Sequence, residues 1–118
     1  MNTTLIDVPV KRIVDWTTFH EVFAEVLGFP AFYGRNMDAW IDCMTCADDP
    51  DAGMVRAAVQ PGQLMTLQID DAADFARRCP EQFNALIECT AFVNFCRVET
   101  RGTPVLSLLL SGHMSADR

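Results

Sequence analysis

The chain lacks most of the features that catalysis or membrane insertion requires. It has two histidines, and it contains no glycine-rich phosphate loop, no nucleophile-elbow motif and no paired-histidine zinc motif. Its longest apolar run, Val105 to Leu110, is far shorter than the roughly 20 residues that span a bilayer. No basic-then-apolar leader opens the sequence. We therefore expect a cytoplasmic protein that is not an enzyme, carries no cofactor or metal and does not contact a membrane.

Positive charge is also scarce. Nine Lys and Arg face 16 Asp and Glu, which gives a net charge of −7. Nucleic acid is then not expected as a direct ligand, because phosphate binding needs a basic patch. The acidic excess has two explanations: it keeps the protein soluble, or it forms a surface that attracts a basic partner. The segment 38–51 supports the second explanation. Its fourteen residues include no Lys or Arg and contain Asp38, Asp42, Asp48, Asp49 and Asp51.

Apolar residues make up 50% of the 118 residues, so residues 1–118 are expected to form one domain with a real core. The five cysteines are an odd number, and in a cytosolic protein they are expected to be buried thiols rather than disulfides. Cys43 and Cys46 form a C-x-x-C pair that is also compatible with zinc or redox chemistry. No second such pair follows, so this alternative is weaker.

The hydrophobic pattern predicts three strands and four helices. Asp15, Asn36 and the Asp70-Asp71 pair are expected to cap helices. Strands separated by helices predict right-handed crossovers and a small parallel sheet, and the last strand, which is nearly all apolar, is expected to be central. In chain order the expected elements are a strand at 5–10, a helix at 16–27, a helix at 36–46, a strand at 63–69, a short helix ending at 78, a helix at 80–99 and a strand at 103–110.

Several side chains between and within these elements carry further expectations. His20 falls off the apolar stripe of its helix and is expected to be exposed. Phe32 is expected to act as a hydrophobic staple, whereas Tyr33 is compatible with either packing or partner contact. Residues 47–62 are expected to be a loop with a short helical turn at 54–59, and residues 111–118 a terminal tail containing His113. The last helix is expected to bury a wide apolar face that includes Phe83, Leu86, Ile87, Thr90, Phe92, Val93, Phe95 and Cys96.

The helix at 36–46 is the main candidate for a binding surface. Asp38 and Asp42 are four residues apart and therefore stack on one helix face. Trp40 and its apolar neighbours Met37, Cys43 and Met44 supply a buried stripe on the other side. The acidic face is our hypothesis for the surface that binds a basic partner.

The same stretch resembles the barstar family of intracellular ribonuclease inhibitors. The resemblance rests on Tyr33-Gly34, Asn36, Asp38-Ala39, Asp42-Cys43 and Thr45. It implies a barstar-like α/β fold and a partner that is a basic extracellular-type ribonuclease or a ribonuclease-like toxin domain. It also implies that carboxylates, Asp42 above all, occupy the places of RNA phosphates in the partner's active site. The expected partner-binding residues are Tyr33, Gly34, Asn36, Asp38, Ile41, Asp42, Thr45 and Cys46.

This chain departs from the family's pattern at several of these positions. Ile41 stands where the family has a tryptophan, Cys46 replaces a glycine, and Arg35 replaces an acidic residue. Arg97 and Arg101 stand where the family has glutamates that help to bind the enzyme, which predicts a reversed local charge. The acidic run at 48–51 is expected to supply other contacts. The alternatives are therefore a barstar-fold interaction module that no longer inhibits a ribonuclease, or an enzyme or redox protein that uses the aspartate pair or the C-x-x-C pair.

Overall fold

A computed structural model describes residues 3–112 of the chain. It contains three parallel strands and four α-helices, so the predicted α/β architecture is confirmed. The tail around His113 lies outside the described residues. The elements are β1 Thr3–Asp7, η1 Val10–Arg12, α1 Trp16–Leu27, α2 Met37–Met44, η2 Pro50–Ala52, β2 Leu64–Ile69, α3 Ala72–Arg78, α4 Pro80–Arg101 and β3 Leu106–Leu110.

The sheet has the strand order β1-β2-β3, with both pairs parallel. The expectation of a central β3 was therefore wrong, because β2 lies in the middle. Both crossovers move in the same direction across the sheet, which leaves β3 at an edge. On the helix-covered face of the sheet, Leu106 and Leu108 of β3 pair with the buried Met65 and Leu67, so packing against the core explains their apolar character. Leu109, on the other face, is 45% exposed.

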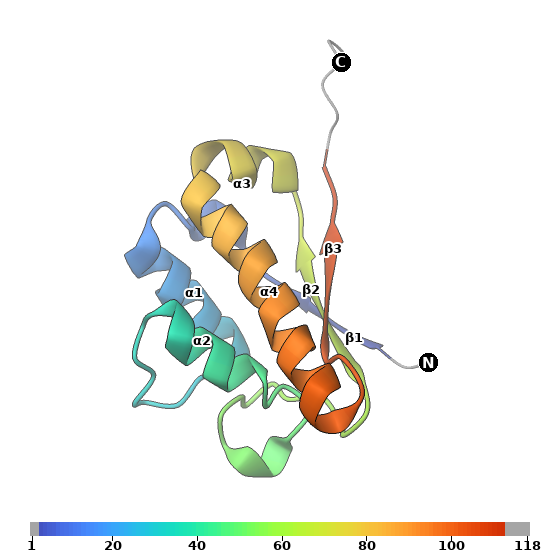
Figure 1. The fold of residues 1–118 in the computed structure, drawn as a ribbon. Coiled ribbons are helices and arrows are strands. Elements are labelled where there is room, and N and C mark those ends of the chain that lie inside the picture. Colours follow the sequence, from blue (N-terminus) through green and yellow to red (C-terminus); the bar gives the residue numbers. More distant parts are fainter. Residues whose placement is uncertain (1–2, 113–118) are drawn as a thin grey trace.

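One face of the sheet is covered by helices, and Figure 1 shows α1, α2 and α4 on that side. The alternation of side chains along the strands follows from this arrangement. Ile69 points into the core and is fully buried, whereas Asp7 and Leu5 on the other face of the sheet are exposed. The acidic helix α2 is thus held on the outer layer, with the core behind it.

The helix ends follow the capping rules in most places. Asp15 caps α1 in a capping box with Thr18, and Gly28 ends that helix in the left-handed conformation. Asn36 caps α2 by accepting a hydrogen bond from the Ala39 amide at 2.8 Å. Asp71 occupies the N-cap position of α3, as predicted, but it makes no side-chain cap hydrogen bond.

The apolar face of α4 is narrower than expected. Leu86 and Val93 are fully buried, but Phe92 is 50% exposed and Phe95 60% exposed. The physical reason is geometric, because a helix lying on one side of a sheet buries about one stripe and not its whole circumference. Among the helices of residues 3–112, none combines the length and hydrophobicity that crossing a bilayer requires.

The long connection between α2 and β2 contains a 3-10 helix at Pro50–Ala52. The expected helical turn at 54–59 was therefore misplaced. Proline at the first position of η2 explains its start, since its fixed φ suits a helical turn and its missing N–H needs no partner there. The segment is anchored by the amide of Val59, which donates to the carbonyl of Ala47 at 2.8 Å.

Candidate functional site

Helix α2 is held in place by its apolar side. Trp40 is fully buried and meets Phe23 of α1 edge to face, with ring centroids 5.7 Å apart. Cys43 and Met44 are also buried, as expected, and Met37 is half-buried. This packing fixes the rotation of α2 about its axis and therefore fixes which side chains face outward.

The outward side chains include both aspartates of the predicted pair. Asp38 and Asp42 are exposed. Among the described residues, neither carboxylate forms an ion pair or accepts a side-chain hydrogen bond. Asp38 also lies in the first turn of α2, where the helix dipole favours a negative charge. The face therefore offers two carboxylates whose hydrogen-bonding capacity is open to a partner, and Arg is the side chain best matched to them.

The turn that leads into α2 is anchored to α1 through Tyr33. Its hydroxyl lies 2.6 Å from Nδ1 of His20, and its ring packs on Phe29 at a centroid distance of 4.7 Å. His20 is only 4% exposed and stacks on Trp16, so the expectation of an exposed histidine was wrong. The open question about Tyr33 has a partial answer: it is half-buried and packs, with its hydroxyl already engaged.

The electrostatics of this anchor favour neutral groups. Burial lowers the pKa of His20, and the positive charge of Arg35 lowers it further. Burial likewise raises the pKa of the Tyr33 hydroxyl above its ordinary range. Arg35 itself adopts a left-handed backbone conformation, φ 56°, and its guanidinium lies 4.0 Å from Glu21 of α1. The turn is thus tied to α1 at two points.

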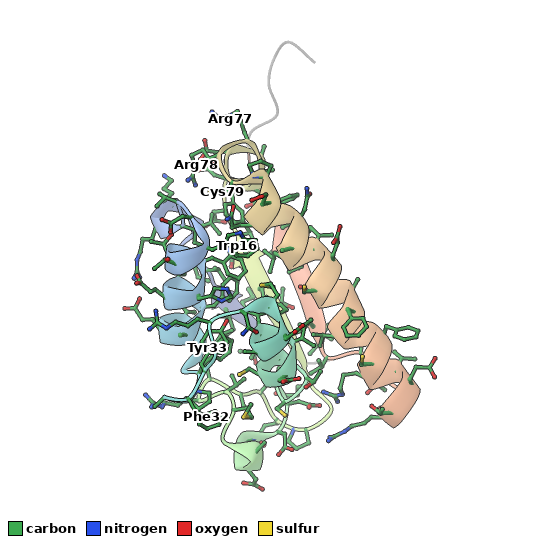
Figure 2. All side chains as sticks on the ribbon, turned by 60° about the vertical axis from the view of Figure 1, so that its left-hand side comes forward. Trp16, Phe32, Tyr33, Arg77, Arg78 and Cys79 are labelled. Atoms are coloured by element: carbon green, nitrogen blue, oxygen red, sulfur yellow. The ribbon has the colours of Figure 1, made fainter. Side chains whose placement is uncertain are left out.

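Phe32 has the opposite environment to Tyr33. It is 75% exposed, so it is not the staple that we expected. Figure 2 shows Tyr33 between α1 and α2 and Phe32 farther out on the same turn. Beside them, Gly34 allows a close approach, because an added Cβ there would lie 3.3 Å from Nδ2 of Asn36. An exposed aromatic next to an acidic helix is a functional candidate that its sequence position alone did not reveal.

The end of α2 holds the remaining predicted contact residues. Thr45 donates its hydroxyl to the carbonyl of Asp42 at 2.8 Å, and Ile41 and Cys46 are half-buried beside it. Asn36, at the start, uses its carbonyl oxygen for the cap. The eight predicted residues therefore lie along one turn, one helix and the two residues after it, but only the two aspartates combine an exposed side chain with an unpaired charge.

Arg97 and Asp48 form a buried ion pair beside this surface. Arg97 is 4% exposed and Asp48 6% exposed, and two parallel contacts of 2.8 and 3.0 Å join the guanidinium to the carboxylate. Burial raises the pKa of Asp48, but hydrogen bonds from Arg97 and the Gly62 amide and the charge of Arg97 outweigh it, so the pKa is lowered. Arg97 also donates to the carbonyl of Thr45 at 3.1 Å, which satisfies a backbone group at the end of α2.

This pair corrects two expectations. Asp48 is not available as an acidic contact for a partner protein, because its carboxylate is buried and paired with Arg97. Arg97 does not reverse the surface charge, because it is buried and neutralised; only Arg101 is exposed there. A hollow of about 390 Å³ separates the ends of α2 and α4, and its lining comprises Thr45, Cys46, Cys96, Arg97, Thr100 and Arg101.

The C-x-x-C pair lies at the end of α2, and both thiols are free. Burial raises the pKa of Cys43 to about 11, with further increases from Cys46 and Asp42. A thiol with such a pKa is protonated at neutral pH and therefore a poor nucleophile. Within residues 3–112, no group of three or more His, Cys, Asp or Glu is placed to hold a metal ion.

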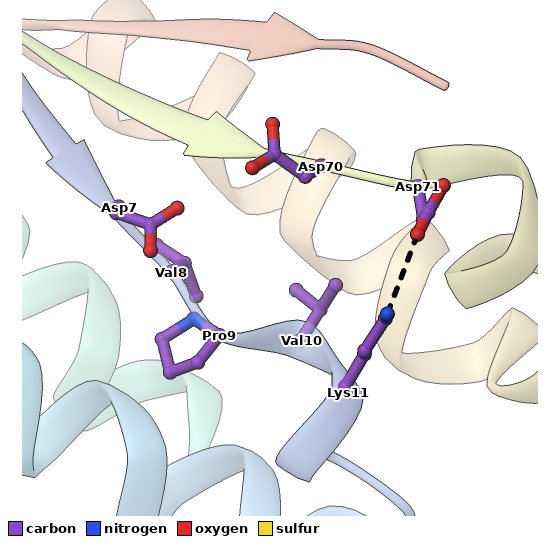
Figure 3. Close-up of a pocket in the computed structure, with 7 residues that line it drawn as sticks. All are labelled: Asp7, Val8, Pro9, Val10, Lys11, Asp70 and Asp71. Carbon is purple, nitrogen blue, oxygen red and sulfur yellow. Dashed lines mark ion pairs between the residues drawn. The ribbon is translucent and has the colours of Figure 1, made fainter. Parts of the chain in front are cut away.

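A second acidic region lies at the carboxyl ends of β1 and β2, where parallel sheets often bind ligands. Figure 3 shows Asp7, Asp70 and Asp71 around a hollow of about 350 Å³. Lys11 pairs with Asp71 at 3.8 Å, and Asp70 accepts hydrogen bonds from Gln68 and Ser111. Two of its three carboxylates are thus engaged internally, in contrast to those of α2.

Comparison with known protein families gives a match to the model described as Barstar (barnase inhibitor), over residues 3–106. The chain belongs to the barstar family. The family is described as an inhibitor of barnase, and the match includes the whole turn and α2. A comparison with curated proteins found no match. The resemblance seen in the motif around Asp42 is therefore a family relationship that extends over most of the chain.

Proposed function

We propose that this barstar-family protein inhibits a small basic ribonuclease, or a ribonuclease-like toxin domain, by covering its active site with the outward face of α2. Asp38 and Asp42 would take the places of RNA phosphates among the partner's cationic side chains. The observation that carries this proposal is the state of these carboxylates: both are exposed and neither is paired among the described residues. A planar carboxylate accepts two hydrogen bonds from Arg, as a phosphate does.

The surroundings of the aspartates support the same proposal. Preorganised interfaces lose less conformational entropy on binding, and this turn is held by the His20–Tyr33 hydrogen bond and the Asn36 cap. Phe32 would add an exposed aromatic contact at the edge of the charged face. The remaining proposed contacts, Gly34, Ile41, Thr45 and Cys46, would shape the surface rather than supply charge.

The proposal includes the absence of enzymatic activity and a cytoplasmic location. The Cys43 thiol is protonated at neutral pH, and the paired carboxylates of α2 face solvent instead of an apolar pocket that would separate their pKa values for acid–base work. All five cysteines are free, which suits a reducing compartment. The alternative of a module without ribonuclease binding loses part of its basis, since Arg97 is not a surface charge.

The decisive experiment is a titration of the protein into a small basic ribonuclease of the barnase type while RNA cleavage is followed. Stoichiometric inhibition is expected. Asp42→Ala should weaken binding by about 2–5 kcal/mol, a range for which the barnase–barstar pair is itself the reference case, and mostly by faster dissociation. Association of the wild-type protein should slow as salt is added.

The matched control is Asp7→Asn, which removes the same charge from the face of the sheet opposite the helices. It should leave inhibition unchanged. Asp42→Asn keeps the shape of the side chain and should behave like Asp42→Ala. Equal inhibition by all four proteins would exclude phosphate mimicry by α2, and no inhibition by the wild type would favour the module that has lost ribonuclease binding.

A further inference from the structure

Helix α4 carries an unusual stripe on its outward side. Glu88, Phe92, Phe95 and Glu99 follow one another at intervals of four, three and four residues, so they line up along one helix face. Phe92 is 50% exposed, Phe95 is 60% exposed, and both glutamates are exposed. We call these four residues the α4 stripe. Single exposed apolar residues need no explanation, but two adjacent phenylalanines between two carboxylates form a defined surface.

The α4 stripe lies on a helix that packs side by side with the acidic helix α2, as Figure 1 shows. Cys89 lies three residues before Phe92 and therefore on the same side of α4. Burial raises the pKa of the Cys89 thiol, and the charges of Glu88 and of Asp38 on α2 raise it further. One flank of the α4 stripe is thus the side of α4 that lies next to α2.

The charge pattern decides what can cover the stripe. A second copy of the chain in antiparallel orientation would set Glu88 against Glu99 and Phe92 against Phe95. In parallel orientation, each glutamate would meet its own counterpart. Both arrangements bring like charges together, and each chain already has a net charge of −7. A partner with apolar side chains flanked by Lys or Arg meets no such conflict.

We propose that the α4 stripe is a second docking surface, which binds an apolar patch bordered by cationic side chains on the same protein that covers α2. This inference rests on the proposed function for the identity of the partner, and it adds residues that the α2 motif does not contain. Phe92 and Phe95 provide desolvated contact area, Val98 beside them extends it, and the two glutamates select positive charge at its ends.

Two probes test this proposal, and the same variants serve both. The first probe is a barnase-type ribonuclease, and the second is a designed helical peptide of Leu and Lys that presents an apolar face bordered by cations. The test variant is Phe92→Ser/Phe95→Ser, whose sites are exposed enough to leave the core intact. The controls are Val14→Ser, which removes another exposed apolar side chain, and Asp42→Ala. The thermal unfolding midpoint of each variant verifies folding.

The double variant should weaken ribonuclease binding by about tenfold or more, whereas Val14→Ser should not. Peptide binding should be lost in the double variant and retained in Asp42→Ala. Unchanged ribonuclease affinity in the double variant would overturn the inference while leaving the proposed function intact. If the wild type binds no ribonuclease, the proposed function fails, and the peptide alone tests the α4 stripe. Loss of peptide binding in the double variant would then support the stripe as a docking surface. Equal peptide binding by the wild type and the double variant, or no peptide binding by either, would overturn it. Sedimentation of the wild type as a dimer that the double variant abolishes would also overturn it, in favour of a second copy.

Discussion

Asp42 and Asp48 lie six residues apart in one acidic segment, yet their environments differ completely. Asp42 is exposed on the outward face of α2, whereas Asp48 is 6% exposed and held by Arg97 through two short contacts. The first carboxylate forms no ion pair among the described residues and is open to a partner. The second is closed to a partner and ties α4 to the segment after α2. An acidic run is therefore not one surface, and each carboxylate has to be placed by its partners.

The sharpest way to test this contrast is to remove the buried carboxylate. Asp48→Ala should lower the free energy of unfolding by about 3–5 kcal/mol, because it leaves the Arg97 guanidinium buried without a counter-charge. Urea denaturation measures the change. The control is Asp51→Ala at an exposed position in η2, which should shift stability by less than about 0.5 kcal/mol. A loss below about 1 kcal/mol for Asp48→Ala would mean that the pair is not a structural element.

Lowering the pH should have a smaller effect on the free energy of unfolding, through protonation of His20, which contacts the Tyr33 hydroxyl. The pKa of His20 is lowered by burial and by Arg35, so the unfolded chain takes up a proton before the folded one. The stability contributed by neutral His20 is therefore full above its ordinary pKa of about 6.5 and is lost as the pH falls through the lower folded value. Two groups of the turn influence His20: the Tyr33 hydroxyl, which contacts its ring, and the positive charge of Arg35, which lowers its pKa. Cys43 of α2 in turn raises the pKa of the Tyr33 hydroxyl.

The measurement is the free energy of unfolding at pH 7.5, 6.5 and 5.5. The wild type should lose stability over this range, and His20→Gln should lose much less. Asp48 does not contribute here, since its lowered pKa places its titration below this window. Equal slopes for the two proteins would show that His20 is not the titrating group.

The smallest effect on stability is expected at the exposed carboxylate. Asp42→Asn should change the free energy of unfolding by no more than about 0.5 kcal/mol, and the sign should favour the variant, because the substitution relieves the repulsion from Asp38 one turn away. Urea denaturation beside Asp48→Ala completes the comparison. Destabilisation by more than about 1 kcal/mol would reveal a structural role for Asp42 and weaken its assignment to partner binding.

Much of this arrangement could be predicted from the sequence because it depends on local signals. The Asp15 cap, the apolar stripe and Gly28 place helix α1 correctly to the residue. The Asn36 cap places the start of α2, but the predicted end at 46 lies two residues beyond Met44. The motif around Asp42 also identified the family, which the match over residues 3–106 confirms.

The errors that matter most for the site concern contacts between residues far apart in the chain. Asp48 and Arg97 are 49 positions apart, and no local sequence pattern near either residue predicts their pairing. The position of His20 on its own helix indicates exposure, but Tyr33 from the turn before α2 packs against it. The strand order placed β2 in the centre, which composition does not encode. Each of these features is decided by tertiary packing, so local patterns were insufficient.

The difference between a binding carboxylate and a structural one is tested most directly by measuring inhibition of a barnase-type ribonuclease and stability together for Asp42→Ala and Asp48→Ala. We expect Asp42→Ala to keep the wild-type unfolding free energy but to lose inhibition. We also expect the folded fraction of Asp48→Ala, at a temperature where it is native, to inhibit stoichiometrically. A stable Asp42→Ala variant that inhibits as well as the wild type would contradict the proposed role of Asp42 in ribonuclease binding.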